Sequence, residues 1–216
     1  MIINSSASAE EKEQIFKLRY RVYIEELEKN HIDNDHVRKI MSDEYDEAGR
    51  YFFAKNEEQV CGALRVILFN EVYLTRLCNV YKLPSGFVNA IDLKSIGFVD
   101  RFVIDKAFRN GLLGLRIMKK LYVDTLNSGI SFGFINAEKA LVPTYYQIGY
   151  RVYDHFYTTT NEKRYLMVCF MRDFDYMNRI NSPLTKCFPE VVLSDDENSV
   201  EIASAHFRFL QESEIN

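Results

Sequence analysis

Long apolar runs, repeats and low-complexity tracts are all missing from this sequence of 216 residues. No run approaches the roughly 18 apolar residues that a membrane-spanning helix needs. The first residues, Met1 to Ala7, lack the basic segment and the long apolar segment of a secretory signal peptide. We therefore expect a cytoplasmic protein without an integral membrane segment.

Cysteine and histidine are scarce and poorly spaced for metal binding. The 4 cysteines form no CxxC pair, and the 4 histidines form no HExxH or similar ligand pattern. We predict no metal site, and we expect reduced thiols that mostly fill the core. The formal net charge of -4 argues against general nucleic-acid binding, which usually accompanies a strongly basic balance. The residues concerned are Cys61, Cys78, Cys169, Cys187, His31, His36, His155 and His206.

Core-forming residues, by contrast, are plentiful. Hydrophobic residues make up 47% of the chain, and 16 Phe and 14 Tyr supply large side chains. This length and composition suit one large domain or one domain with a tail. The polar end, with Asp195-Asp-Glu-Asn, predicts a domain over residues 1–180 and a partly ordered C-terminal extension over 181–216.

The periodicity of apolar residues predicts an α/β protein. Ser8 and Glu11 form a capping box that opens a helix reaching about Glu28. Residues 29–50 are expected to form a loop or short helix, and residues 70–96 an irregular insertion. The remaining strands and helices alternate, which favours a central sheet with crossover helices. We expect strands at 51–54, 60–69, 98–104, 131–136, 150–158 and 165–171, and helices at 112–127, 140–148 and 173–181.

The stretch from Asp100 to Met118 is the most informative part of the chain. It reads as a buried strand, a short basic turn with two glycines, and an amphipathic helix. A glycine-containing turn at a helix N-terminus leaves backbone N–H groups unpaired where the helix dipole favours anions. The turn therefore predicts a site for a phosphate or pyrophosphate. A second helix, closed by Gly149, runs into a later strand.

With these two features, a set of motifs over residues 10–175 resembles a known family. An arginine four residues before an aromatic lies on the first helix, and an Asp-x-Tyr-Asp-like motif follows. An arginine on the next hairpin and an Arg-Phe strand complete the pattern. The chain resembles the GNAT-fold acyl-homoserine lactone synthases and N-acyl amino acid synthases, which implies a GNAT fold with a mixed twisted sheet flanked by helices. The matching positions are Arg19, Tyr23, Asp43, Asp46, Arg65, Arg101 and Phe102.

Two departures from the lactone-synthase pattern matter. The tryptophan expected about six residues beyond the first-helix aromatic is replaced by Lys29, and the chain contains no tryptophan. The acidic residue expected before the strand arginine is replaced by Phe98, with Asp100 adjacent to the arginine instead. The segment from Met171 to Leu184 looks closer to the N-acyl amino acid synthases, and the resemblance therefore favours that branch.

The donor loop departs as well. The usual acetyl-CoA loop reads Arg/Gln-x-x-Gly-x-Gly/Ala, whereas here Leu112 stands where a glycine lets the backbone approach pyrophosphate. The resemblance implies donor contacts from the loop residues Arg109, Asn110, Gly111 and Gly114. With Leu112 at this position the loop would bind pyrophosphate less closely. Such a loop is compatible with the phosphopantetheine of an acyl carrier protein as well as with acyl-CoA. Carrier proteins are acidic, so a basic rim could dock one, although such a rim is equally consistent with a solvated helix face. The rim comprises Lys106, Arg109, Arg116, Lys119 and Lys120.

The resemblance also implies how acyl transfer would proceed. Backbone N–H groups near Val103 and Ile104 would polarise the thioester carbonyl. Tyr145, four residues before Gly149, takes the position of a thiolate-protonating tyrosine. The alternative for Tyr145 is an aromatic residue packed at a helix end.

A carboxylate, acting directly or through water, would take the proton of the acceptor amine. Asp43, Asp46 and Asp100 are the candidates, although Asp43 and Asp46 could equally form an acidic turn. Arginine pairs bidentately with carboxylates. We therefore expect two of the arginines Arg19, Arg65 and Arg101 to interlock with these acids, and one to hold a substrate carboxylate.

Three functional readings follow. The first is an N-acyltransferase that moves a fatty acyl group from acyl carrier protein or acyl-CoA to an amino-acid amine. The second is an ordinary acetyl-CoA-dependent N-acetyltransferase, and the third is a non-catalytic GNAT-like module that binds an acyl carrier or a protein partner. A lactone-forming signal synthase is a further branch, which detection of a lactone product would support.

Overall fold

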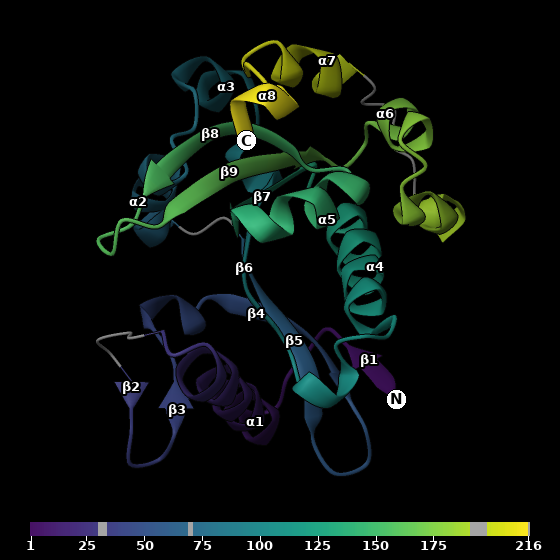
Figure 1. The fold of residues 1–216 in the computed structure, drawn as a ribbon. Helices are drawn as coiled ribbons and strands as arrows, with labels where there is room; N and C mark the ends of the chain where they lie inside the picture. The colour runs from purple at the N-terminus through teal and green to yellow at the C-terminus, as the bar shows by residue number, and fades with distance from the viewer. Residues whose placement is uncertain (30–33, 69–70, 191–197, 216) are drawn as a thin grey trace. The chain divides into compact units, whose positions relative to one another are not determined.

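The computed structural model describes residues 1–29, 34–68, 71–190 and 198–215 (Figure 1). Seven strands form one mixed sheet in the order β1-β4-β5-β6-β7-β9-β8. Strands β6 and β7 pair in parallel, and the pairs β1–β4, β4–β5, β7–β9 and β8–β9 are antiparallel. The chain divides into two compact units: residues 1–68 with 99–124, and residues 69–98 with 125–216.

The first unit is built on the β4–β5 hairpin. Helix α1 begins at the predicted capping box, where Ser8 accepts from the Glu11 amide at 3.2 Å and Glu11 accepts from the Ser8 amide at 3.0 Å. Its buried residues Ile15 and Leu18 pack into a cluster with Phe53 of β4 and Val60 of β5. The elements are β1 Ile2–Asn4, α1 Ala9–Tyr20, β2 Asn34–Asp35, β3 Ile40–Met41, β4 Gly49–Lys55, β5 Val60–Ile67, most of α4 Leu113–Asn127 and the end of β6 Ile96–Ile104.

The predicted first helix changes character at its end. The α-helix stops at Tyr20 and continues as a π-helix over Arg21–Glu26, where the Leu27 amide donates to the Val22 carbonyl at 3.1 Å. Apolar periodicity cannot distinguish these two helix types, because both bury one face.

The second unit has an aromatic core. The Phe87 ring lies 5.2 Å from that of Phe132, and Phe134 lies 6.1 Å from Tyr153. Phe207 from the C-terminal extension packs into the same core, 4.9 Å from Phe87. The elements are α2 Glu71–Val80, α3 Ser85–Ala90, the start of β6, β7 Phe132–Glu138, α5 Val142–Gln147, β8 Arg151–Tyr157, β9 Lys163–Phe170, α6 Phe174–Arg179, α7 Asn198–Ser204 and α8 Glu212–Ile215.

Most predicted strands and helices are confirmed. Strand β1 was not predicted, and the short paired strands β2 and β3 lie within residues 29–50, where a loop or short helix was expected. The expectation of an irregular insertion over 70–96 is wrong, because α2, α3 and a 3-10 turn at Leu93–Ser95 occupy its described part. Leu77, Tyr81 and Phe87 are buried there, so tertiary packing stabilises short helices that lack strong sequence signals. The predicted domain boundary at residue 180 stays a prediction, although residues 198–215 pack within the second unit.

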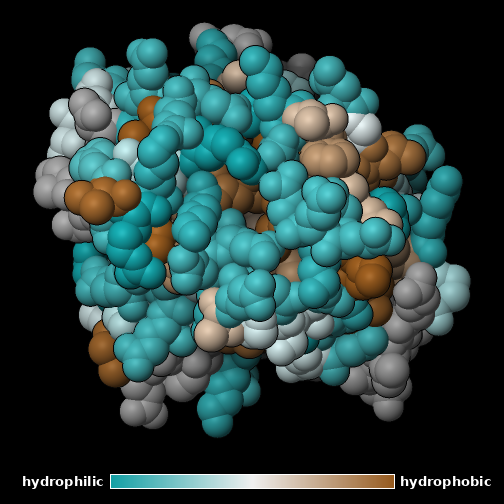
Figure 2. Space-filling model, turned by 90° about the horizontal axis from the view of Figure 1, so that it is seen from below, coloured by the Kyte–Doolittle hydropathy of each residue, from teal (hydrophilic) through white to brown (hydrophobic). Residues whose placement is uncertain are grey.

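The face shown in Figure 2 is largely hydrophilic, with hydrophobic residues singly or in small groups. Across the described part of the chain, none of the helices combines the length and apolarity needed to cross a bilayer.

Candidate functional site

Arg65 on β5 is the centre of an ion network in the first unit. Its side chain is fully buried. Its Nε and Nη2 atoms donate to the two oxygens of Asp100 at 2.8 and 2.6 Å, a bidentate pair. Nη1 donates to Asp46 at 2.7 Å and also to Asp43, and Nη2 donates to the second Asp43 oxygen at 3.1 Å. One guanidinium thus binds all three aspartates that the sequence singled out.

Two further arginines extend this network. Arg19 donates to Asp46 at 2.7 Å, and Arg101 donates to Asp43 at 2.8 and 3.2 Å. Three positive and three negative side chains therefore balance, which is what makes such a buried cluster tolerable. Two of the three arginines were expected to pair with these acids. All three do, so none is left free of the network.

The turn at residues 43–46 fixes two of the carboxylates. Asp43 caps a 3-10 helix over Glu44–Asp46, accepting from the Tyr45 amide at 3.0 Å. Asp46 reaches back to accept from the Asp43 amide at 2.8 Å. The two interpretations of this acidic segment are thus compatible: the turn forms, and it presents both carboxylates to Arg65.

Aromatic rings complete the buried side of the network. The Tyr51 hydroxyl donates to the Asp46 carboxylate at 2.8 Å. The Arg19 guanidinium lies 5.3 Å from the Phe16 ring centroid and 5.4 Å from that of Tyr51. Its Nε and Nη2 have no hydrogen-bond partner among the described residues. Cation–π contact therefore stabilises the charge there. Sequence reasoning did not identify Tyr51, because one tyrosine among 14 carries no distinguishing signal.

The arginines control the ionisation of these acids. Burial alone would raise the pKa of Asp43, but the hydrogen bonds and charge of Arg65, with those of Arg101, hold it well below its usual range. Burial is likewise outweighed at Asp46, whose pKa is lowered by Arg19 and Arg65. These carboxylates remain ionised at neutral pH, so they bind a cation well and accept a proton poorly.

This ionisation predicts how stability depends on pH. The unfolded carboxyl groups take up protons below about pH 4, whereas folded Asp43 and Asp46 do so only at lower pH. Their stabilisation is therefore complete above the unfolded pKa and is lost as the pH falls through the folded values. Each group contributes up to about 1.4 kcal/mol per pH unit in that window. Urea unfolding between pH 2 and 6 should show this acid limb.

The matched variants for this prediction are Asp43→Asn and Glu58→Gln. Asp43→Asn should flatten the acid limb, because one shifted group is gone. Glu58→Gln, at an exposed position in the β4–β5 turn, should leave the slope as in the original protein. Equal slopes in all three proteins would contradict the assignment.

Strand β6 is strained beside the network. Arg101 adopts a φ of 52°, which side chains other than glycine seldom do, especially inside a strand. The Phe102 carbonyl then accepts from the Tyr23 hydroxyl at 3.4 Å, and the Ile104 carbonyl accepts from Arg109 Nε at 2.9 Å. The predicted substrate residues Tyr23, Arg101 and Phe102 thus meet in one place within the first unit.

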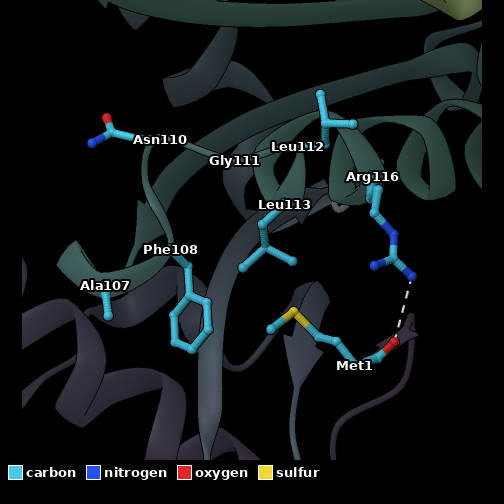
Figure 3. A pocket seen from close by; sticks show the side chains of 8 residues that line it. All are labelled: Met1, Ala107, Phe108, Asn110, Gly111, Leu112, Leu113 and Arg116. Carbon is cyan, nitrogen blue, oxygen red and sulfur yellow. Dashed lines mark hydrogen bonds between the residues drawn. The ribbon is translucent and has the colours of Figure 1, made fainter.

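The predicted donor loop borders a pocket of about 310 Å³ (Figure 3). The side chains of Met1, Phe108 and Leu113 point towards one another, whereas Asn110 points away from them. Gly114 lies close to Phe102, because a Cβ there would lie 3.3 Å from Cζ of that ring. The full lining comprises Met1, Ala107, Phe108, Asn110, Gly111, Leu112, Leu113 and Arg116.

The start of α4 is suited to an anion. The Leu112 carbonyl accepts from the Arg116 amide at 3.0 Å, which places Leu112 at the N-cap position. Leucine has no side-chain oxygen with which to cap the first turn. A phosphate could therefore satisfy the amides that a serine or aspartate would otherwise cap.

The basic rim predicted for carrier docking is partly neutralised. Arg109 forms an ion pair with Glu26, and Lys120 with Asp124 at 2.8 Å. Arg116 donates to the Met1 carbonyl at 3.4 Å. The sequence did not indicate a role for Glu26, because its partner Arg109 lies 83 positions away along the chain.

Tyr145 belongs to α5 of the second unit. It is half-buried, and its ring lies 5.8 Å from that of Tyr150. The helix ends at Gln147 with Ile148 as its C-cap, and Gly149 follows with a φ of 111°, which confirms the predicted glycine stop. Tyr145 is thus the one predicted side-chain candidate that lies in the second unit.

The structure also bears on metal binding. Within residues 1–29, 34–68, 71–190 and 198–215, no group of three or more His, Cys, Asp or Glu side chains could hold a metal ion. His31 lies outside the described residues.

Comparison with known proteins agrees with this architecture. Residues 18–119 match the family model of the acetyltransferase (GNAT) domain. Among curated proteins, no sequence matches the chain. Several solved structures match the chain at sequence identities of 12–20%, and such low identity supports a likeness in fold. The chain therefore has the predicted GNAT fold.

Three of these structures span nearly the whole chain. The CoA-dependent acyl-homoserine lactone synthase BjaI, solved with MTA, is 20% identical with a TM-score of 0.62, covering 94% of this chain and 97% of its own. The AHL synthase LasI is 15% identical with a TM-score of 0.65, at 90% and 98% coverage. FeeM, an N-acyl amino acid synthase from uncultured soil microbes, is 12% identical with a TM-score of 0.64, at 86% and 96% coverage.

Proposed function

We propose that this GNAT-fold protein is an N-acyltransferase that moves a fatty acyl group from an acyl thioester to the amine of an amino acid. One observation carries the proposal: the aspartates and arginines that resemble the synthase motifs converge on Arg65 in a single network. The likeness in fold to BjaI, LasI and FeeM supports it.

The acceptor amine would lie against the more accessible edge of the network. Asp43 and Asp100 are 19% and 26% exposed, whereas Asp46 is 7% exposed. We assign the first two to the amine, which they attract as an ammonium ion before water removes its proton. Asp46 positions them through Arg65. Tyr23, Arg101 and Phe102 would line the acceptor site beside them.

The donor thioester would lie along the end of β6. The N–H groups of Val103 and Ile104 would polarise its carbonyl, and the loop residues Arg109, Asn110, Gly111 and Gly114 would hold its phosphate. The neutral amine nitrogen bonds to the carbonyl carbon and releases its second proton to water, the C–S bond breaks, and the thiolate takes a proton from Tyr145, which regains one from solvent. The products are an amide and a free thiol.

An acetyl-CoA-dependent N-acetyltransferase is the second candidate. The observation that favours it is the family model matched by residues 18–119, whose description is an acetyltransferase domain. The two candidates differ in acyl chain length and in the carrier that delivers the thioester.

Thiol release tests the proposal. Purified protein is offered long-chain acyl carrier protein, long-chain acyl-CoA or acetyl-CoA, each with pooled amino acids, and products are identified by mass spectrometry. We expect an N-acyl amino acid from a long-chain donor. Turnover with acetyl-CoA alone would favour the second candidate. Tight donor binding without thiol release would support a non-catalytic module that binds an acyl carrier, and a lactone product would identify a signal synthase.

A further inference from the structure

The π-helix over Arg21–Glu26 contacts the end of β6, the residue that follows it and the donor loop, with one side chain each. The Arg21 guanidinium pairs with Asp105 at 2.5 Å, directly after β6. The Tyr23 hydroxyl donates to the Phe102 carbonyl, and Glu26 pairs with Arg109. π-Helical turns are rare, and they often occur at functional sites.

Arg109 is the first residue of the loop motif, and its guanidinium is already engaged. Nε donates to the Ile104 carbonyl at 2.9 Å, and Nη2 donates to the Glu26 carboxylate. The pair is only partly shielded, with side-chain exposures of 36% for Arg109 and 23% for Glu26. An anion arriving from solvent could therefore compete for Arg109, but it would meet the negative charge of Glu26 next to it.

We propose that Glu26 sets donor selectivity by occupying Arg109, which disfavours CoA relative to carrier-bound phosphopantetheine. This inference rests on the proposed function, because it takes the Arg109 loop as the donor site. CoA brings a pyrophosphate and a 3′-phosphate, whereas a carrier-bound prosthetic group brings a single phosphodiester. Repulsion by Glu26 and neutralisation of Arg109 both weigh more heavily on the donor with more phosphate charge.

The chain offers a matched control one residue away. Glu25 lies in the same π-helical turn, but its carboxylate pairs with Lys39 at 2.7 Å. Glu25→Gln and Glu26→Gln remove the same charge from neighbouring positions. Only the second releases Arg109.

Calorimetric titration with CoA and with adenosine 3′,5′-diphosphate measures the effect without catalysis. Glu26→Gln should bind each ligand about three- to fivefold more tightly than the original protein, which is the range expected for a partly exposed ion pair. Glu25→Gln should stay within about 1.5-fold. In an Arg109→Gln background the gain from Glu26→Gln should disappear, because the two residues act as one unit.

Several results would overturn this inference. Equal tightening by both glutamine variants would show a general charge effect. Weaker binding by Glu26→Gln would mean that the pair prepares Arg109 for the nucleotide. CoA binding to none of the variants at millimolar concentration would mean that the loop holds no nucleotide phosphate. Thiol release is scored separately, so its absence with every donor would refute the proposed function and leave the binding comparison intact.

Discussion

Replacing Arg65 by methionine is expected to lower the free energy of unfolding by about 3–5 kcal/mol. The buried guanidinium holds Asp43, Asp46 and Asp100 at once, and methionine fills much of its volume without its charge. Asp46 retains Arg19 and Asp43 retains Arg101. The loss therefore falls most heavily on Asp100, and on the surplus negative charge left in a site of low dielectric constant.

Chemical unfolding of two further variants identifies the cause. Arg65→Lys keeps the charge but cannot form two parallel hydrogen bonds, so its stability should lie between the original protein and Arg65→Met. Arg50→Met removes an arginine from neighbouring β4, where the partly exposed pair with Asp124 spans 3.5 Å. Arg50→Met should lower the free energy of unfolding by less than about 1 kcal/mol. A similar small cost for Arg65→Met would refute a network centred on this residue.

Tyr145→Phe is expected to reduce kcat by about 10²-fold, the lower end of what general acid catalysis contributes. The substitution keeps the ring that packs 5.8 Å from Tyr150 and removes only the hydroxyl. Departure of the thiolate then proceeds without its proton donor. KM for the donor should change little, because the hydroxyl acts on the leaving group as the C–S bond breaks.

The adjacent residue supplies the control for this variant. Tyr146 lies on the same helix, and its hydroxyl donates to the Leu210 carbonyl at 3.5 Å. Tyr146→Phe should change kcat by less than about twofold. An acyl thioester of an acidic aryl thiol tests the role directly, because its thiolate leaves without protonation. Tyr145→Phe should approach the original rate with that donor, whereas an equal defect with both donors would indicate a structural role.

If neither Tyr145→Phe nor Asp43→Asn altered turnover, chemistry would not depend on these groups. A binding module would then be the better account of the same fold. The stability prediction for Arg65 would still hold, because it depends on charge balance within the first unit and not on catalysis.

Short sequence signals were enough to predict most of the local structure. The capping box at Ser8 started α1, and the spacing of apolar residues identified the β4–β5 hairpin. The glycine turn predicted β6 followed by α4, and Gly149 ended α5 as expected. Such signals lie within a few residues of the structure that they specify.

Sequence also identified the charged members of the network, but neither Tyr51 nor the pairing of the charges. The motifs singled out three arginines and three aspartates. Arg65 pairs with Asp100, 35 positions away, and Arg19 with Asp46, 27 positions away. Those distances are set by strand pairing and by the packing of α1, which local patterns do not encode. One of the three arginines was expected to stay free for a substrate carboxylate, but all three pair with the aspartates.

The remaining features depend on contacts that form only in the folded chain. The π-helical turn, the Glu26–Arg109 pair and the φ of 52° at Arg101 have no signature in residue spacing. Helices α2 and α3 depend on burying Leu77 and Phe87 in an aromatic core. In each case the stabilising partner is remote in sequence, so the free energy that selects the conformation arises only when the chain has folded.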